Sequence, residues 1–236
     1  MTLSVDLFLS LRSPYSYLAL PKTSKLVADY DVTVNLRPVY PLAVRVPGFF
    51  KKTNPQFARY VVLDSSRVAK HDDIPFRFPR PDPIVQDMAT LEVAAQQPYI
   101  HRLTRLGAMA QLEGRSLDFV AAIAPVLWDG TVKGWNEGDH LANAAAGAGF
   151  DLAAMDAAIS ADPDRYEQVI SDSESDHAAS GHWGADFRVR EGAVFRAGPH
   201  RSLDLAHAKQ GAGSPPRTGE AGRNGGGTQA GLVLSA

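Results

Sequence analysis

Ser13 is the residue of this sequence best placed to do chemistry, because a strand is expected to end and a helix to begin there. Val5–Leu11 is largely apolar with partial alternation, which predicts a mostly buried strand. Ser13-Pro14 then supplies a preferred N-cap residue followed by the imino acid favoured at the first helical position. Apolar residues continue at helical spacing over Tyr15–Asp29. Taken alone, this pattern makes Ser13 a plain N-cap.

The chain contains no cysteine. Disulfides, thiolate metal ligands and redox chemistry by the protein's own sulfur are therefore excluded. Any thiol reacting near Ser13 would have to arrive on a ligand. The histidines lack ligand spacing on a helix face, so no metal site is expected either.

The elements around Ser13 predict an α/β start followed by helices. Val32–Val39 returns to strand-like alternation, and the short connections favour a parallel β-α-β crossover. Pro41–Pro83 is rich in proline and predicts loop with one helix over Tyr60–His71. Further helices are predicted over five segments: Asp87–Gly107, Leu117–Asp129, His140–Ala148, Leu152–Ala161 and Tyr166–Ala179.

The order of several motifs is similar to that of a known family. These are Asp6–Ala19, Arg37–Pro41, Asn54-Pro55, Phe76–Pro79, Arg80–Met88 and Gly181–Gly184. Together they resemble the 2-hydroxychromene-2-carboxylate isomerases, which are related to the kappa-class glutathione transferases and belong to the DsbA-like thioredoxin group. The resemblance implies a thioredoxin-like fold interrupted by an all-helical insertion. Residues 1–45 would form the N-terminal β-α-β unit, and residues 46–180 the helical insertion with its proline-rich loop.

The resemblance also implies a reaction. In this family a serine at the position of Ser13 replaces the redox cysteine of thioredoxins and holds glutathione as cofactor. A hydroxyl donor at a helix N-terminus stabilises a bound thiolate, and this lowers the pKa of the thiol. The thiolate then catalyses cis–trans isomerisation of a small aromatic carboxylate during aromatic compound degradation.

Three further residues are candidates for the site. The resemblance makes Asn54 a glutathione contact, whereas its alternative role is a turn residue before Pro55. Tyr15 could face the substrate ring, although a first-turn aromatic residue more often packs in the core. Arg45 could bind the substrate carboxylate, although a solvated loop arginine is the commoner case.

The sequence departs from the family after Gly184. Family members continue with Gly-Val-Pro-Thr, whose proline is cis and borders the site, whereas this chain continues Ala185-Asp186-Phe187-Arg188. Back-translation with a shift of one base permits a family-like ending that starts Val-Pro-Thr-Phe and later contains Gly-Gln-Asp-Arg. We therefore hypothesise a frameshift, which would leave the sheet without its last two strands and would make the activity of this chain an open question. Residues 181–210 would be a remnant of the thioredoxin C-terminal half, and the glycine-rich residues 211–236 a disordered tail.

Composition limits the remaining classes of function. Lys plus Arg is 24 against 26 Asp plus Glu, so no basic surface for nucleic acid or an anionic membrane is expected. The N-terminus lacks the pattern of a signal peptide, which predicts a cytoplasmic protein. The resemblance allows a homodimer. Two alternatives remain open: a kappa-like glutathione transferase or DsbA-like protein acting on another substrate, and an inactive glutathione-binding protein.

Overall fold

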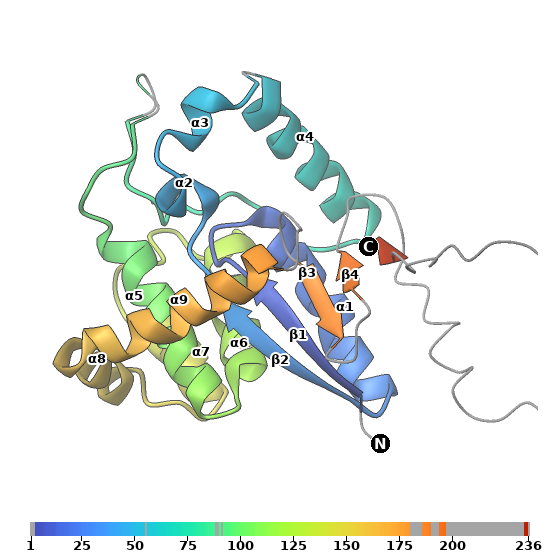
Figure 1. Cartoon of the computed structure of the whole chain (residues 1–236), viewed down its shortest axis with the longest axis vertical. Helices are drawn as coiled ribbons and strands as arrows, with labels where there is room; N and C mark the ends of the chain where they lie inside the picture. Colours follow the sequence, from blue (N-terminus) through green and yellow to red (C-terminus); the bar gives the residue numbers. More distant parts are fainter. Residues whose placement is uncertain are drawn as a thin grey trace, which may run out of the picture.

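The fold begins with the predicted β-α-β unit (Figure 1). The computed structural model describes residues 3–54, 56–87, 90, 92–179, 186–189, 194–196 and 234–235. Strand β1 spans Leu3–Leu9, helix α1 Pro14–Asp29 and strand β2 Val32–Pro38. The two strands pair in parallel from Leu3 opposite Val32 to Leu9 opposite Pro38. In the view of Figure 1, α1 lies behind these strands and α9 (Pro163–Ala179) crosses in front of them.

The sheet continues beyond β1 on the side away from β2. Its order is β2-β1-β3-β4-β5, with β3 at Asp186–Val189, β4 at Val194–Arg196 and β5 at Leu234–Ser235. β3 pairs antiparallel with β1, and β4 antiparallel with β3. A parallel β-α-β unit extended by an antiparallel pair is the strand arrangement that the thioredoxin-like prediction requires.

This extension corrects one expectation. The frameshift hypothesis predicted a sheet without its last two strands, but β3 and β4 are both present. The segment is able to form strands because it combines aromatic and β-branched residues, namely Phe187, Val189, Val194 and Phe195. Of the tail predicted to be disordered, only Leu234–Ser235 lies among the described residues, and it pairs with β4 as β5.

Helices make up most of the remaining described chain. They are α2 (Leu42–Arg45), α3 (Phe49–Lys52), α4 (Gln56–His71), α5 (Pro98–Leu112), α6 (Ser116–Trp128), α7 (His140–Gly147), α8 (Leu152–Ala161) and α9. The core joins the sheet to the helical part through fully buried side chains such as Leu7, Leu36 and Phe119. Trp128 is buried in the same core, and its indole N–H donates to the backbone oxygen of Leu11 at 2.9 Å.

One predicted helix starts in the wrong place. Residues 87–97 were expected to begin the helix that actually starts at Pro98. Pro98 explains this start, because proline is favoured at the first helical position and breaks a helix when it lies inside one. The side chain of the preceding Gln97 accepts from the backbone N–H of Val85 and donates to the carbonyl oxygens of Val85 and Ala94. These bonds join Val85 and Ala94 to the start of α5, and an isolated bridge pairs Gln86 with Val93.

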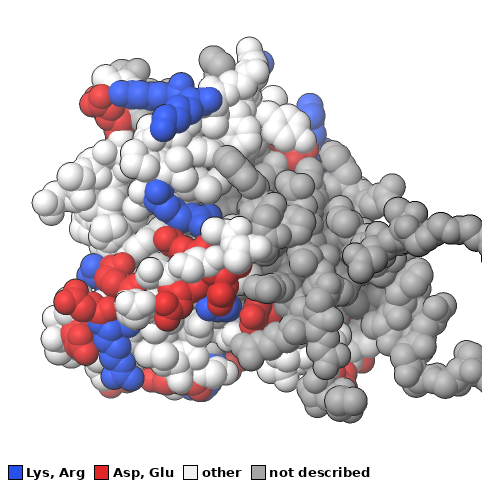
Figure 2. All heavy atoms as spheres, in the orientation of Figure 1, with Lys and Arg blue, Asp and Glu red and all other residues white. Residues whose placement is uncertain are grey.

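Charge is distributed unevenly over the face shown in Figure 2. Acidic side chains gather along α9, which carries Asp164, Glu167, Asp172, Glu174 and Asp176. Basic side chains lie over α3, where Lys51 pairs with Glu92 at 2.8 Å. Over the part of the chain that the structure describes, no helix has the length and apolar character needed to cross a membrane.

Candidate functional site

The turn from β1 into α1 places the Ser13 hydroxyl at the helix N-terminus. The backbone N–H of Ser13 donates to the carbonyl oxygen of Ser10 at 3.0 Å, which closes the turn. Ser13 is the N-cap of α1, and its Oγ accepts from the backbone N–H of Ser16 at 3.3 Å. Because Oγ acts as an acceptor in this bond, its own hydrogen remains available for an anion beside the helix. The first turn of α1 contains no acidic side chain that would compete with such an anion.

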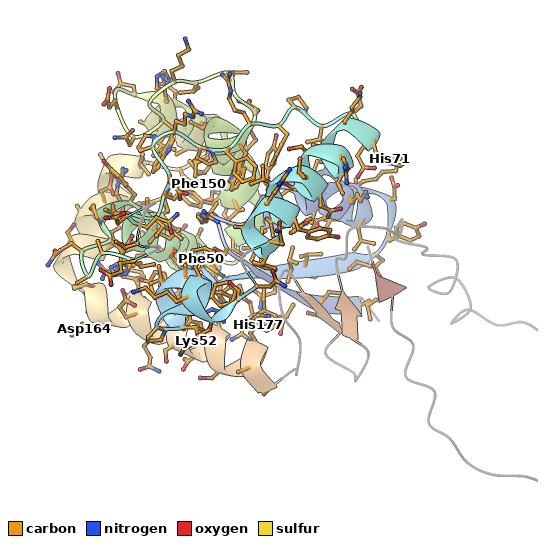
Figure 3. The ribbon with its side chains drawn as sticks, turned by 90° about the horizontal axis from the view of Figure 1, so that it is seen from above. Phe50, Lys52, His71, Phe150, Asp164 and His177 are labelled. Atoms are coloured by element: carbon orange, nitrogen blue, oxygen red, sulfur yellow. The ribbon has the colours of Figure 1, made fainter. Side chains whose placement is uncertain are left out.

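Ser13 lines a cavity of ≈ 180 Å³. Much of its wall is aromatic or aliphatic and comes from five segments: Tyr15 on α1, Val39–Ala43 after β2, Phe49 and Phe50 on α3, Phe57 and Val61 on α4, and Ile84. Figure 3 looks down on this region, with Phe50 on α3 and His177 close to the end of α9. Polar groups reach the cavity from Ser10, Arg12, Ser13, Tyr40 and Arg45. An apolar cavity with a few polar groups is the usual form of a small-molecule site.

Tyr15 connects this cavity to α4. Its hydroxyl donates to Oδ2 of Asp64 at 2.6 Å, and Asp64 is only 3% exposed. Burial, the hydrogen bond to Asp64 and the charge of Asp64 all raise the pKa of Tyr15 well above its ordinary value. Tyr15 therefore stays protonated and directs its single hydroxyl hydrogen at the carboxylate rather than at the cavity.

Arg45 brings a cation to the same cavity. Its Nη1 lies 3.3 Å from Nδ1 of His177, which belongs to α9 and is 3% exposed. Its Nε is buried and has no hydrogen-bond partner among the described residues. Burial lowers the pKa of Arg45, and the nearby charge of Glu174 opposes that shift. A guanidinium in this setting would be stabilised by a ligand anion.

Helix α9 supports the segment that forms one wall of the cavity. The backbone N–H of Tyr40 donates to Oε1 of Glu174 at 2.9 Å, and its phenol donates to Oε1 of Glu167 at 2.7 Å. Arg37 also donates to Asp176 on the same helix. The sequence analysis did not identify Asp64, Glu174 or His177 as site residues.

Asn54 is not part of the cavity. Its side-chain oxygen accepts from the backbone N–H of Gln56 at 2.9 Å, and its carbonyl oxygen accepts from that of Phe57. This is an exposed turn at the start of α4. The structure thus brings Ser13, Tyr15 and Arg45 together and leaves Asn54 outside.

A second cavity, of ≈ 430 Å³, lies between α5, α8 and α9. Its two arginines are already paired, Arg102 with Asp156 and Arg105 with Glu167, each at 2.7 Å. Its charges are therefore largely balanced from within the protein. Nowhere in the described part of the chain do three histidine, aspartate or glutamate side chains gather in a group that could hold a metal ion.

Comparison with known families identifies the fold. Residues 4–189 match the DSBA-like thioredoxin domain. This chain belongs to the DsbA-like thioredoxin family. The match runs from β1 through all the described helices to β3, so the helical part is included in the DsbA-like domain.

Solved structures show the same DsbA-like fold at low sequence identity. A 2-hydroxychromene-2-carboxylate isomerase is 20% identical, covers 89% of this chain and 93% of its own, and superposes with a TM-score of 0.58. A probable DsbA oxidoreductase from Streptomyces coelicolor is 17% identical, with 93% and 94% covered and a TM-score of 0.59. The cytosolic disulfide reductase DsbM from Pseudomonas aeruginosa is 17% identical, with 81% and 87% covered and a TM-score of 0.51. No curated protein sequence matches the chain.

Proposed function

We propose that this protein is a glutathione-dependent cis–trans isomerase that acts on a small aromatic carboxylate of the 2-hydroxychromene-2-carboxylate type. The observation that carries the proposal is that Ser13 and Arg45 line the same aromatic-walled cavity in a chain without cysteine. The first residue fits a thiolate and the second fits a carboxylate. One of the similar structures is a 2-hydroxychromene-2-carboxylate isomerase, which supports proposing an isomerisation of that type here.

The surroundings of Ser13 fit the thiol of glutathione. Ser13 offers a hydroxyl hydrogen at the positive end of α1, whose first turn contains no acidic side chain. When bound, glutathione would supply the nucleophilic sulfur that this cysteine-free chain lacks.

The protein's own contribution is binding and orientation. Ser13 would donate its hydroxyl hydrogen to the sulfur and keep it ionised. Arg45 would bind the substrate carboxylate, while Phe49, Phe57 and Val61 pack around the ring and exclude water. Protein-thiol redox chemistry, as in a disulfide reductase, is not available to a chain that contains no cysteine.

The test is an isomerisation assay on 2-hydroxychromene-2-carboxylate with and without glutathione, alongside calorimetric titration of glutathione. We expect turnover only when glutathione is present. Ser13→Ala should reduce that turnover by about 10²-fold or more, which is typical for loss of a donor to a developing anion.

Other outcomes would redirect or refute the proposal. Glutathione binding with conjugation of electrophiles but no isomerisation would indicate a kappa-like transferase. Binding without either reaction would indicate an inactive glutathione-binding protein. Glutathione-dependent isomerisation that is unchanged in Ser13→Ala would refute the role of Ser13.

A further inference from the structure

Arg45 is held by a different kind of group from the other side-chain-paired arginines of the described chain. Those arginines contact carboxylates, as Arg102 does when it pairs with Asp156 at 2.7 Å. The side-chain partner of Arg45 is instead the imidazole of His177. A carboxylate offsets the charge of a guanidinium, whereas a neutral imidazole accepts one of its hydrogens and leaves the positive charge in place.

The chemistry of the two groups fixes the direction of this hydrogen bond. A guanidinium can only donate, so Nδ1 of His177 must be the acceptor at 3.3 Å, and an imidazole that accepts through Nδ1 is uncharged. His177 lies towards the C-terminal end of α9 (Figure 3) and is 3% exposed. Its ring stacks on Phe8 of β1, with 5.1 Å between the ring centroids. The acceptor for Arg45 is therefore held in place by the core of the protein.

The carboxylate that acts on Arg45 is engaged elsewhere. The charge of Glu174 favours the charged form of Arg45, but no ion pair joins the two side chains in the part of the chain that the structure describes. Oε1 of Glu174 accepts instead from the backbone N–H of Tyr40 at 2.9 Å. Arg45 thus reaches the cavity wall as a half-buried cation without a carboxylate bound to it.

We propose that His177 is a positioning residue that holds Arg45 without neutralising it, so that the charge of Arg45 is available to a ligand carboxylate. His177 does not line the cavity and therefore acts through Arg45. This inference rests on the proposed function, in which Arg45 binds the substrate carboxylate. It adds the residue that keeps Arg45 ready to do so.

The test compares two ligands that share a ring and differ in charge, benzoate and benzamide. Binding of each to the full-length protein without glutathione is measured by calorimetry. The native protein should bind benzoate about tenfold or more tightly than benzamide, because only benzoate is an anion. The ratio of the two affinities is the readout, since a general disturbance of the cavity weakens both ligands and leaves their ratio in place.

Two substitutions of nearly identical shape separate holding from neutralising. His177→Asn supplies a neutral oxygen acceptor and should keep the preference for benzoate. His177→Asp supplies an acceptor that is charged, so it should pair with Arg45 and bring the ratio to about one or below. A purely structural role of His177 would affect the two variants alike.

A third variant and a control keep the test independent of how well a buried aspartate folds. His177→Phe retains a ring that can stack on Phe8 but has no acceptor, and should lower the ratio about three- to tenfold. Ser173→Ala is the control, because Ser173 is also buried on α9 but donates to the backbone oxygen of Val169 within the helix. It should keep the native ratio. Thermal unfolding of each variant verifies that it is folded.

Failure of this inference is distinguishable from failure of the proposed function. If Arg45→Met abolishes the preference for benzoate while His177→Asp and His177→Phe keep it, the role of His177 is wrong and the carboxylate site stands. If His177→Asn loses the preference as fully as His177→Asp, the neutrality of the acceptor is not what matters, and the inference is also wrong. A native protein without any preference for benzoate would overturn both the inference and the proposed carboxylate site.

Discussion

Arg45 on α2 and His177 on α9 are in contact, with Nη1 of the first 3.3 Å from Nδ1 of the second, although 132 residues separate them in sequence. Helix α9 therefore reaches back to the cavity beside Ser13. The helical part of the chain is a support for the site and not merely an insertion into the fold. The side chains that it contributes determine how Arg45 is presented.

Replacing Arg45 should weaken ligand binding without lowering the free energy of unfolding. Arg45→Met should weaken binding of an aromatic carboxylate by about 10- to 100-fold, which is the usual effect of losing a hydrogen bond to a charged group. Arg45→Lys should recover only part of this affinity, because an ammonium cannot reproduce the guanidinium geometry. The methionine variant should be no less stable than the native protein, since it removes a desolvated cation.

Calorimetry with benzoate and urea unfolding would measure the two effects of Arg45→Met. Arg59→Met is a suitable control, because Arg59 is exposed on α4 and does not line the cavity. Unchanged benzoate binding in Arg45→Met would contradict the role of Arg45.

The two roles of Ser13 can be separated by the choice of substitution. Ser13→Ala should cost about 1 kcal/mol of unfolding free energy through loss of the N-cap, whereas Ser13→Gly should cost only a few tenths. Both variants lack the hydroxyl, so both should lose glutathione-dependent turnover to a similar extent. Denaturant unfolding and the isomerisation assay report these quantities separately. If Ser13→Gly kept most of the turnover while the less stable Ser13→Ala lost it, Ser13 would act only as a helix cap.

The contrast between Ser13 and Asp64 shows how far the sequence could predict the site. Ser13 was recognisable because a cap, a proline and a helical pattern are adjacent in sequence, and the structure places it at the predicted N-cap. Asp64 lies 49 residues from Tyr15 and within a helix whose buried positions are Asp64, Ser65 and Ala69. Nothing local marks a buried carboxylate on a helix whose apolar residues Tyr60, Val62 and Leu63 are exposed. Such contacts depend on how α4 packs against α1, which periodicity does not specify.

The late start of α5 has a local signal that the apolar pattern alone does not include, because Pro98 is favoured at the first helical position and cannot lie inside a helix without breaking it. The side chain of Gln97, which precedes this proline, makes three hydrogen bonds to the backbone of Val85 and Ala94. The strands of the sheet were more predictable, because β1 and β2 lie in the core and their apolar pattern reflects burial directly.

Gly107 should resist substitution although it lies within a helix. Glycine-to-alanine changes in helices usually stabilise by up to about 1 kcal/mol. At Gly107, however, an added Cβ would lie 2.9 Å from Cγ of Pro38, a buried ring that cannot rotate away. We expect Gly107→Ala to destabilise the protein by about 1–3 kcal/mol, as overpacking does. Gly147→Ala is the matched control, because a Cβ there meets nothing within 4 Å and should be neutral or stabilising. Chemical denaturation of both variants tests the difference.

Glu174 should make stability depend on pH. Burial raises its pKa in the folded protein, although the Tyr40 N–H and Arg45 oppose that shift. A carboxyl group with a raised folded pKa holds its proton more tightly when folded than when unfolded. Its favourable contribution is complete below the unfolded pKa and is lost as pH rises through the folded pKa.

Glu174→Gln keeps an oxygen that can accept from the Tyr40 N–H but cannot ionise. The variant should therefore lose this decline of unfolding free energy with rising pH, measured by urea titrations on both sides of the ordinary glutamate range. An unchanged pH profile would show that Glu174 does not titrate differently in the two states. Glu92→Gln, on an exposed side chain paired with Lys51, controls for general effects of charge removal.

The region after Gly184 can be tested at the level of the gene. The present frame contains no proline between Pro163 and Pro199, so it cannot supply the cis-proline that the resembled family has beside its site. The segment 180–185, where that proline would belong, lies outside the described residues. Among the described residues, the cis peptide bond is Arg80–Pro81.

Sequencing across codons 183 and 184 should reveal a gain of one base, or a loss of two, relative to the ancestral frame. Restoring that frame should place Val-Pro-Thr directly after Gly184 and increase glutathione affinity, measured by calorimetry. A gene sequence that confirms the present frame, together with homologues that share this ending, would refute the frameshift, and the site would then have to function with Ala185-Asp186 where the family has proline.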